Sequence, residues 1–139
     1  MALPTTRRPS RARDRRAPGW APLAALLTAT GVLHFARPAP FASIVPRRLG
    51  DPLPWVHGSG VAELACAAGL AVPATRRPAA LATAALFVGV FPANVQMAVS
   101  ALRSRRASTA YRAVALGRLP LQAPLVAWAL RVARAEGRR

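Results

Sequence analysis

The stretch AALATAALFVGVFPANVQMAVSAL, residues 79–102, decides the fold. It carries no formal charge, and it is longer than the roughly 20 apolar residues that an α-helix needs to cross a hydrocarbon core about 30 Å thick. We therefore expect a transmembrane helix here. Pro92 interrupts the run just before Asn94 and Gln96. A proline in a helix interior removes one backbone hydrogen bond, which predicts a kink in front of these two amides.

Three further runs approach the same length, so the sequence predicts an all-α, four-helix transmembrane bundle. They cover residues 17–36, 54–73 and about 115–133. The last run contains Arg118 and Arg131, and it spans the bilayer only if it begins upstream near Ala113 or if both arginines snorkel to the headgroups. Three spans plus an interfacial helix is the alternative.

Charge is segregated from these apolar runs. The chain has 139 residues, the size of one domain, and combines 53% hydrophobic residues with a net charge of +16. All the basic residues are arginines, and they cluster between the uncharged runs. Such segregation argues against a nucleic-acid partner and favours the lipid bilayer. We expect a basic, disordered arm over residues 1–16, a membrane domain over residues 17–134 and a basic tail over residues 135–139.

The loops predict the topology. The turn at residues 74–78 is short enough that the second and third spans form an antiparallel hairpin. An up-down bundle with both termini on one side follows. Placing the N-terminus inside puts the larger share of the arginines in the cytoplasm, although the loop at residues 100–118 runs against this bias. An uncleaved first span is favoured over a signal peptide, because no clean small-x-small cleavage site follows the first apolar run.

Glu63 is the most unusual residue within the predicted spans. A charged side chain at the bilayer centre costs about 2.5 to 3.5 kcal/mol on insertion scales, so its presence asks for a reason. Two readings stay open: a protonated Glu63 that hydrogen-bonds to a neighbouring helix, and a proton or ligand site. Gly60 and Ser59 share a helix face with Glu63, and Gly58 and Gly60 would let another backbone approach closely.

Other polar residues fall at the same depth under the predicted topology. Together they form a candidate intramembrane polar cluster in one leaflet, and Glu63 is the member that lies deepest in the bilayer. The members are Glu63, Asn94, Gln96, Gln122, His34, His57 and Ser59. The alternative for Asn94 and Gln96 is that they repair backbone hydrogen bonds around the kink at Pro92.

The sequence predicts no cofactor, catalytic residue or metal ligand. Cys66 is the only cysteine, which excludes an internal disulfide and a dithiol redox mechanism within this chain. Haem held by His34 and His57 is a weaker alternative, because both histidines look interfacial. A metal held by His34, His57 and Glu63 is equally weak, because these residues show no diagnostic ligand spacing. Bound quinone is a further alternative. No phosphate loop or hydrolase elbow is present.

Four stretches resemble the DoxX-like family of small integral membrane proteins. They are GVLHFARP from Gly31, SGVAEL from Ser59, ATRRPAALATAALFVGVFPANVQMA from Ala74 and RLPLQ from Arg118, and the resemblance covers residues 20–134. It implies a four-helix transmembrane bundle with both ends on one side. It also implies an association with quinone-linked thiosulfate oxidation or other redox partners, but it carries over no catalytic residue.

These observations predict a multi-pass protein of the bacterial inner (plasma) membrane with cytoplasmic termini. The leading hypothesis is a non-catalytic accessory or anchoring subunit of a membrane redox assembly, whose partner is a membrane or peripheral oxidoreductase. The alternative is a binder or carrier of a quinone, another lipid or a proton that uses the cluster around Glu63. An enzyme in its own right is a third reading that lacks a nucleophile, metal set or cofactor motif. A homo-oligomer stays open.

Overall fold

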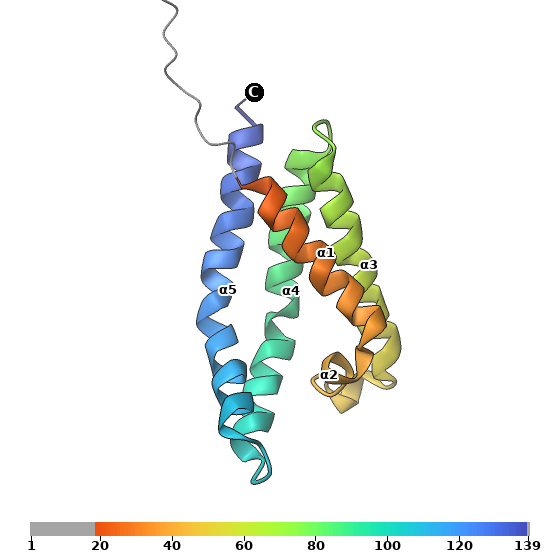
Figure 1. Cartoon of the computed structure of the whole chain (residues 1–139), viewed down its shortest axis with the longest axis vertical. Coiled ribbons are helices and arrows are strands. Elements are labelled where there is room, and N and C mark those ends of the chain that lie inside the picture. Colours follow the sequence, from red (N-terminus) through yellow and green to blue (C-terminus); the bar gives the residue numbers. More distant parts are fainter. Residues whose placement is uncertain (1–18, 139) are drawn as a thin grey trace, which may run out of the picture.

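The computed structural model describes residues 19–138, and these residues are entirely helical apart from turns and loops (Figure 1). The α-helices are α1 (Trp20–Ala36), α2 (Pro38–Ala42), α3 (Pro52–Ala71), α4 (Arg76–Arg103) and α5 (Thr109–Glu136), and a 3₁₀ helix η1 (Arg47–Leu49) precedes α3. The predicted arm at residues 1–16, the first two residues of the first predicted span, and Arg139 lie outside the described residues.

Local capping explains where α3 and α5 begin. The Asp51 side chain accepts a hydrogen bond from the Leu53 backbone N–H at 3.1 Å, with Pro52 at the first helical position of α3. The Ser108 hydroxyl accepts from the Tyr111 N–H at 3.2 Å and starts α5. Helix α5 therefore begins upstream of Ala113, which meets one of the two alternative conditions for the predicted fourth span.

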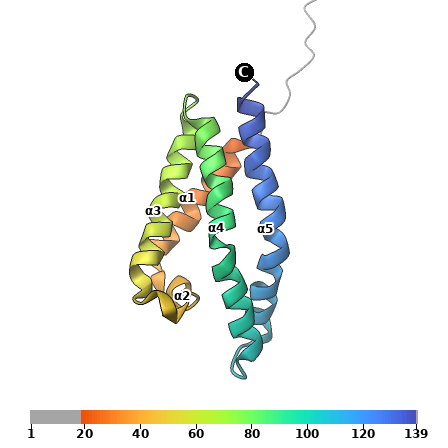
Figure 2. The same cartoon turned by 180° about the vertical axis from the view of Figure 1, so that it is seen from behind.

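The helices form two antiparallel hairpins, which Figures 1 and 2 show from opposite sides. The first hairpin is α1 with α3, and the second hairpin is α4 with α5. They meet at the end that holds the α3–α4 turn and the C-terminal end of α5. Toward the other end, where α2 lies, they diverge.

The apolar core follows this arrangement. Its larger cluster lies where the hairpins meet and takes residues from all four long helices. The cluster contains Leu23, Leu27, Cys66, Ala67, Leu70, Ala80, Ala84, Phe87, Ala129, Val132 and Ala133. A smaller cluster of Met97, Ala101 and Ala115 joins α4 to α5 near the opposite end. Between the two clusters the hairpins are not held together by a continuous core.

A buried arginine ties the four long helices at the closed end. Arg76 donates from Nε to the Leu70 carbonyl oxygen at 2.8 Å, and its guanidinium lies 4.2 Å from the ring centroid of Trp20. Its Nη1 atom lies 3.6 Å from Glu136 Oε1. Because these groups come from α1, α3, α4 and α5, Arg76 holds the hairpins together where they meet.

Two of the described helices, α4 and α5, are long and apolar enough to cross a membrane. Only 28% and 17% of their most apolar stretches are buried within the chain. Helix α1 is apolar but has 17 residues, and α3 has 20 residues with lower hydropathy because it contains Glu63, His57 and several small residues.

Candidate functional site

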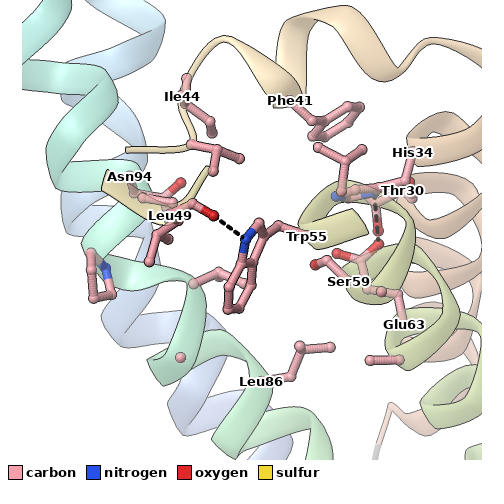
Figure 3. Close-up of a pocket in the computed structure, with 18 of the residues that line it drawn as sticks. Thr30, His34, Phe41, Ile44, Leu49, Trp55, Ser59, Glu63, Leu86 and Asn94 are labelled. Carbon is pink, nitrogen blue, oxygen red and sulfur yellow. Dashed lines mark hydrogen bonds and ion pairs between the residues drawn. The ribbon is translucent and has the colours of Figure 1, made fainter. Parts of the chain in front are cut away.

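A cavity of about 790 Å³ lies where the two hairpins diverge. Figure 3 shows side chains of the first hairpin on one side, Asn94 of α4 on the other, and Trp55 between them. Apolar groups supply most of the lining, including Phe41, Ile44, Leu49, Trp55, Leu86 and Val90. The polar side chains that line it are Thr30, His34, Ser59, Glu63, Asn94 and Arg118. The cavity is thus apolar with polar groups concentrated on the α1–α3 side, where Thr30, His34, Ser59 and Glu63 form what we call the polar wall.

A close crossing of α1 and α3 builds the polar wall. A Cβ atom on Gly60 would lie 2.8 Å from the His34 Cβ atom and 3.2 Å from the Gly31 carbonyl oxygen, so only glycine allows this approach. The predicted close approach at Gly60 is therefore confirmed. At Gly58 it is wrong, because no atom lies within 4 Å of a Cβ built there; that residue lines the cavity instead. The crossing places His34 and Glu63 beside each other.

His34 and Glu63 form a buried pair. His34 Nδ1 lies 2.8 Å from the Thr30 carbonyl oxygen and 3.5 Å from Glu63 Oε2. Since a carbonyl oxygen can only accept, Nδ1 carries the hydrogen, and in the neutral ring Nε2 is then an acceptor. The imidazole also stacks on Phe41, with ring centroids 3.9 Å apart, so Phe41 of α2 helps to orient the His34 ring.

Glu63 has hydrogen-bonding capacity left for a ligand. The side chain is 12% exposed, and its Oε2 atom is buried without a hydrogen bond from the described residues. The groups that act on this carboxyl come from both hairpins: Thr30 and His34 from α1, and Arg118 from α5. A ligand group with an N–H or O–H donor would satisfy the remaining oxygen.

The opposite wall is held by an amide pair. Asn94 donates from Nδ2 to Gln122 Oε1 at 3.1 Å, and Gln122 donates from Nε2 to the Phe87 carbonyl oxygen. Asn94 and Gln122 are both buried. Gln122 therefore ties α5 to the backbone of α4 at Phe87. The carbonyl that lacks its helical partner because of Pro92 is that of Val88, so the repair role suggested for Asn94 and Gln96 stays a prediction.

The predicted polar cluster is brought together only in part. His34, Ser59, Glu63 and Asn94 line the cavity, and Gln122 joins them through Asn94. Two predicted members lie elsewhere. Gln96 is exposed and donates to Ser100 Oγ at 3.3 Å, and His57 is exposed and stacks on Phe35 with ring centroids 5.2 Å apart.

Pro92 lines the cavity within a helix that continues through it. Its ring lacks the N–H that would bond the Val88 carbonyl, so the backbone of α4 is weakened beside the cavity. The kink predicted at this position stays a prediction. Pro92 and the buried Asn94, two residues apart on α4, both line the cavity.

Several lining residues were not recognised in the sequence. Thr30 lies one turn before His34, so the helical spacing of four residues was an available signal. Trp55 donates from Nε1 to the Leu49 carbonyl oxygen at 3.1 Å and lines the cavity, as does Phe41 of α2. Arg118 was considered only for its effect on the length of the fourth span. No signal in the sequence places these three in the cavity.

Metal and haem ligation gain no support from the arrangement of the described residues. Within residues 19–138, no group of three or more His, Cys, Asp or Glu side chains could hold a metal ion. His34 and His57 stack on different phenylalanines, Phe41 and Phe35.

Comparison with curated proteins and with solved structures gives no match. Residues 23–133 match a family described as a domain of unknown function (DUF8561). The matched residues include α3, α4, most of α1 and α5, and the whole cavity lining. Because this match covers most of the chain, the protein belongs to the DUF8561 family.

Proposed function

We propose that the protein is a four-span membrane protein that binds an amphipathic small molecule in the cavity between its two hairpins. Helices α1, α3, α4 and α5 would be the spans, with both chain ends on the cytoplasmic side of the bacterial inner membrane. The observation that carries the proposal is the cavity of about 790 Å³ with apolar lining and a polar wall in which His34 is buried and the other members are partly buried.

Exposed apolar side chains support the membrane location. Large hydrophobic residues lie on the outside of all four long helices, among them Val32, Phe35, Val61, Leu81, Val88, Leu102, Val114 and Leu121. In water such a surface would favour association. At 1.5 Å per residue, the 20 residues of α3 extend about 30 Å, which matches the hydrocarbon core.

The polar wall supports a ligand with one polar end. Moving a carboxyl group into an apolar region is costly unless it forms hydrogen bonds, and Glu63 Oε2 has a buried position without one. A hydroxyl, amine or amide of the ligand would donate to Glu63, while the ring of Trp55 and the side chains of Leu49 and Leu86 would contact its apolar part. Quinols and other single-headed lipids have this chemistry, and a proton carrier would need only Glu63.

Lipid analysis of purified protein tests this function. Wild-type protein in mild detergent should retain a lipid-soluble molecule at near one copy per chain, detected by mass spectrometry of an organic extract. Glu63→Leu removes the hydrogen-bonding group and should lower this occupancy by about tenfold or more, since hydrogen bonds to charged or buried partners contribute about 1.5 to 3 kcal/mol. Glu63→Gln keeps a hydrogen-bond acceptor and should retain the ligand.

Gln96→Leu is the matched control, because Gln96 is an exposed polar residue outside the cavity. It should leave occupancy unchanged. Equal occupancy in wild type and in Glu63→Leu would argue that Glu63 is a purely structural hydrogen-bonding residue.

The role of accessory subunit in a redox assembly is the second candidate. It derives from the DoxX-like resemblance, whereas the cavity is a feature of the chain itself, so it takes second place. The two roles are compatible, since a subunit that holds a quinol could serve a partner enzyme. Affinity purification in mild detergent that recovers no oxidoreductase in stoichiometric amount would count against the accessory role without affecting the cavity.

A further inference from the structure

A basic notch lies at the closed end of the bundle, away from the cavity between the hairpins. It has a volume of about 360 Å³ and lies between the start of α4 and the end of α5. Arg77, Arg134 and Arg138 line it, and no acidic residue is among the described residues of its lining. Three like charges around one hollow repel each other unless an anion lies between them.

The neighbouring charges are already engaged elsewhere. Arg76, next to Arg77, points inward to Glu136, Trp20 and the carbonyl oxygen of Leu70. Glu136 is the acidic residue closest in sequence to the notch, and its carboxylate lies 3.6 Å from Arg76. Arg76 therefore faces the core, whereas Arg77 faces the notch.

The position of Arg77 depends on a glycine. A Cβ atom on Gly137 would lie 3.1 Å from Arg77 Nε and 3.3 Å from its Cζ atom, so the Arg77 side chain lies directly over the end of α5. On α5 itself, Arg138 donates from Nε to the Arg134 carbonyl oxygen at 3.3 Å. The three side chains are exposed and remain accessible from outside the bundle.

Apolar residues continue the notch toward the middle of the bundle. Leu81 lies four residues after Arg77, and Leu130 lies four residues before Arg134, so each leucine shares a helix face with an arginine one turn away. Both leucines line the notch, and Leu81 is 47% exposed. The surface thus presents positive charge at the helix ends and apolar side chains one turn deeper.

We infer that the basic notch binds the phosphate headgroup of an anionic phospholipid, with its acyl chains lying along Leu81 and Leu130. Guanidinium groups bind phosphate through paired hydrogen bonds, and basic sites between helices at the cytoplasmic side are suited to anionic headgroups. The inference rests on the proposed membrane location but is independent of the cavity and of any ligand at Glu63.

Lipid titration of the full chain tests the notch. Protein in mild detergent is titrated with phosphatidylglycerol or with phosphatidylcholine of the same acyl chains, and bound lipids are counted by native mass spectrometry. Wild-type protein should bind phosphatidylglycerol more tightly than phosphatidylcholine. The double variant Arg77→Gln/Arg134→Gln should lose about twentyfold in affinity for phosphatidylglycerol, because each arginine near an anionic headgroup contributes about fivefold. Its affinity for phosphatidylcholine should not change.

Arg105→Gln/Arg106→Gln is the matched control, since it removes two exposed arginines from the α4–α5 loop at the opposite end. It should retain the wild-type affinity within about twofold, and Arg77→Lys/Arg134→Lys should restore most of the affinity by restoring the charge.

Equal losses in the two glutamine variants would overturn the site in favour of a general charge effect. Displacement of phosphatidylglycerol by millimolar inorganic phosphate would identify free phosphate as the ligand and overturn the lipid assignment. Loss of the protein from the membrane fraction of cells would instead contradict the membrane location.

Discussion

At the scale of single residues, Gln122 holds the second hairpin together beside the cavity. It accepts a hydrogen bond from Asn94 and donates one to the Phe87 carbonyl oxygen. Both partners are on α4, and Asn94 is buried. An apolar residue at position 122 would leave an amide and a carbonyl without these bonds in an apolar region.

Gln122→Leu should therefore destabilise the protein by about 1 to 3 kcal/mol, the cost of leaving buried polar groups unsatisfied. Thermal unfolding in mild detergent would detect this as a melting temperature several degrees below wild type. Gln96→Leu replaces an exposed glutamine on α4 and should leave the melting temperature nearly unchanged. Equal stability of the two variants would show that the Asn94–Gln122 pair contributes little.

At this scale the sequence predicted four of the six polar side chains that line the cavity, and the helical phase explains why Gln96 and His57 lie outside it. Glu63 stood out because a charged side chain within an apolar run is costly. His34, Gln96 and His57 were grouped with it by depth in the membrane. Gln96 lies two residues after Asn94, and residues two apart point to nearly opposite sides of a helix. His57 lies six residues before Glu63, about 240° around the helix, so it shares the depth of the cluster but not its face.

At the scale of elements, the crossing of α1 and α3 at Gly60 positions the polar wall. A methyl group at this position would lie 2.8 Å from both the His34 Cβ atom and the Phe35 Cε2 atom. The helices would have to separate to accommodate it. The His34 ring and the Glu63 carboxyl would separate with them.

Gly60→Ala should therefore lower stability by about 1 to 3 kcal/mol through overpacking, and it should also reduce retention of the cavity ligand. Gly58→Ala is a sharp control, because it lies on the same helix two residues away with no atom within 4 Å of the new methyl group. It should be neutral or slightly stabilising, since alanine favours a helix over glycine by about 1 kcal/mol. Thermal unfolding of both variants separates the outcomes. If Gly58→Ala proved as harmful as Gly60→Ala, the crossing would not be the cause.

Apolar runs and the prolines and charges between them predicted the positions of the long helices closely. They did not predict the short helices in the connection at residues 37–51. The second and third predicted spans, residues 54–73 and 79–102, correspond to α3 and α4 with ends displaced by a few residues. The connection is rich in prolines and arginines, and it contains the short helices α2 and η1. The backbone N–H groups in the first turn of a helix have no partner within the helix, so a proline there loses no hydrogen bond, and Pro38 begins α2.

At the scale of the whole molecule, the cavity results from the divergence of two hairpins that are tied at one end. The joint at Arg76 and the larger core cluster close that end, and α2 lies near the other. Crossing angles depend on the packing of side chains from distant segments, and no pattern within one helix reports them. The sequence therefore predicted the helices and the buried acid, but not the volume between them.

Quenching of Trp55 fluorescence tests the central claim most directly, because Trp55 lines the cavity beside the proposed ligand. The full chain in mild detergent is titrated with a long-chain alcohol that is brominated on its alkyl chain. Its hydroxyl can donate to Glu63, its bromine quenches tryptophan on contact, and the Trp55→Phe variant supplies the background from Trp20 and Trp128. We expect saturable quenching near one alcohol per chain, weakened about tenfold by Glu63→Leu and unchanged by Gln96→Leu. Quenching that rises linearly without saturation, or that is the same in the Glu63→Leu variant, would contradict it.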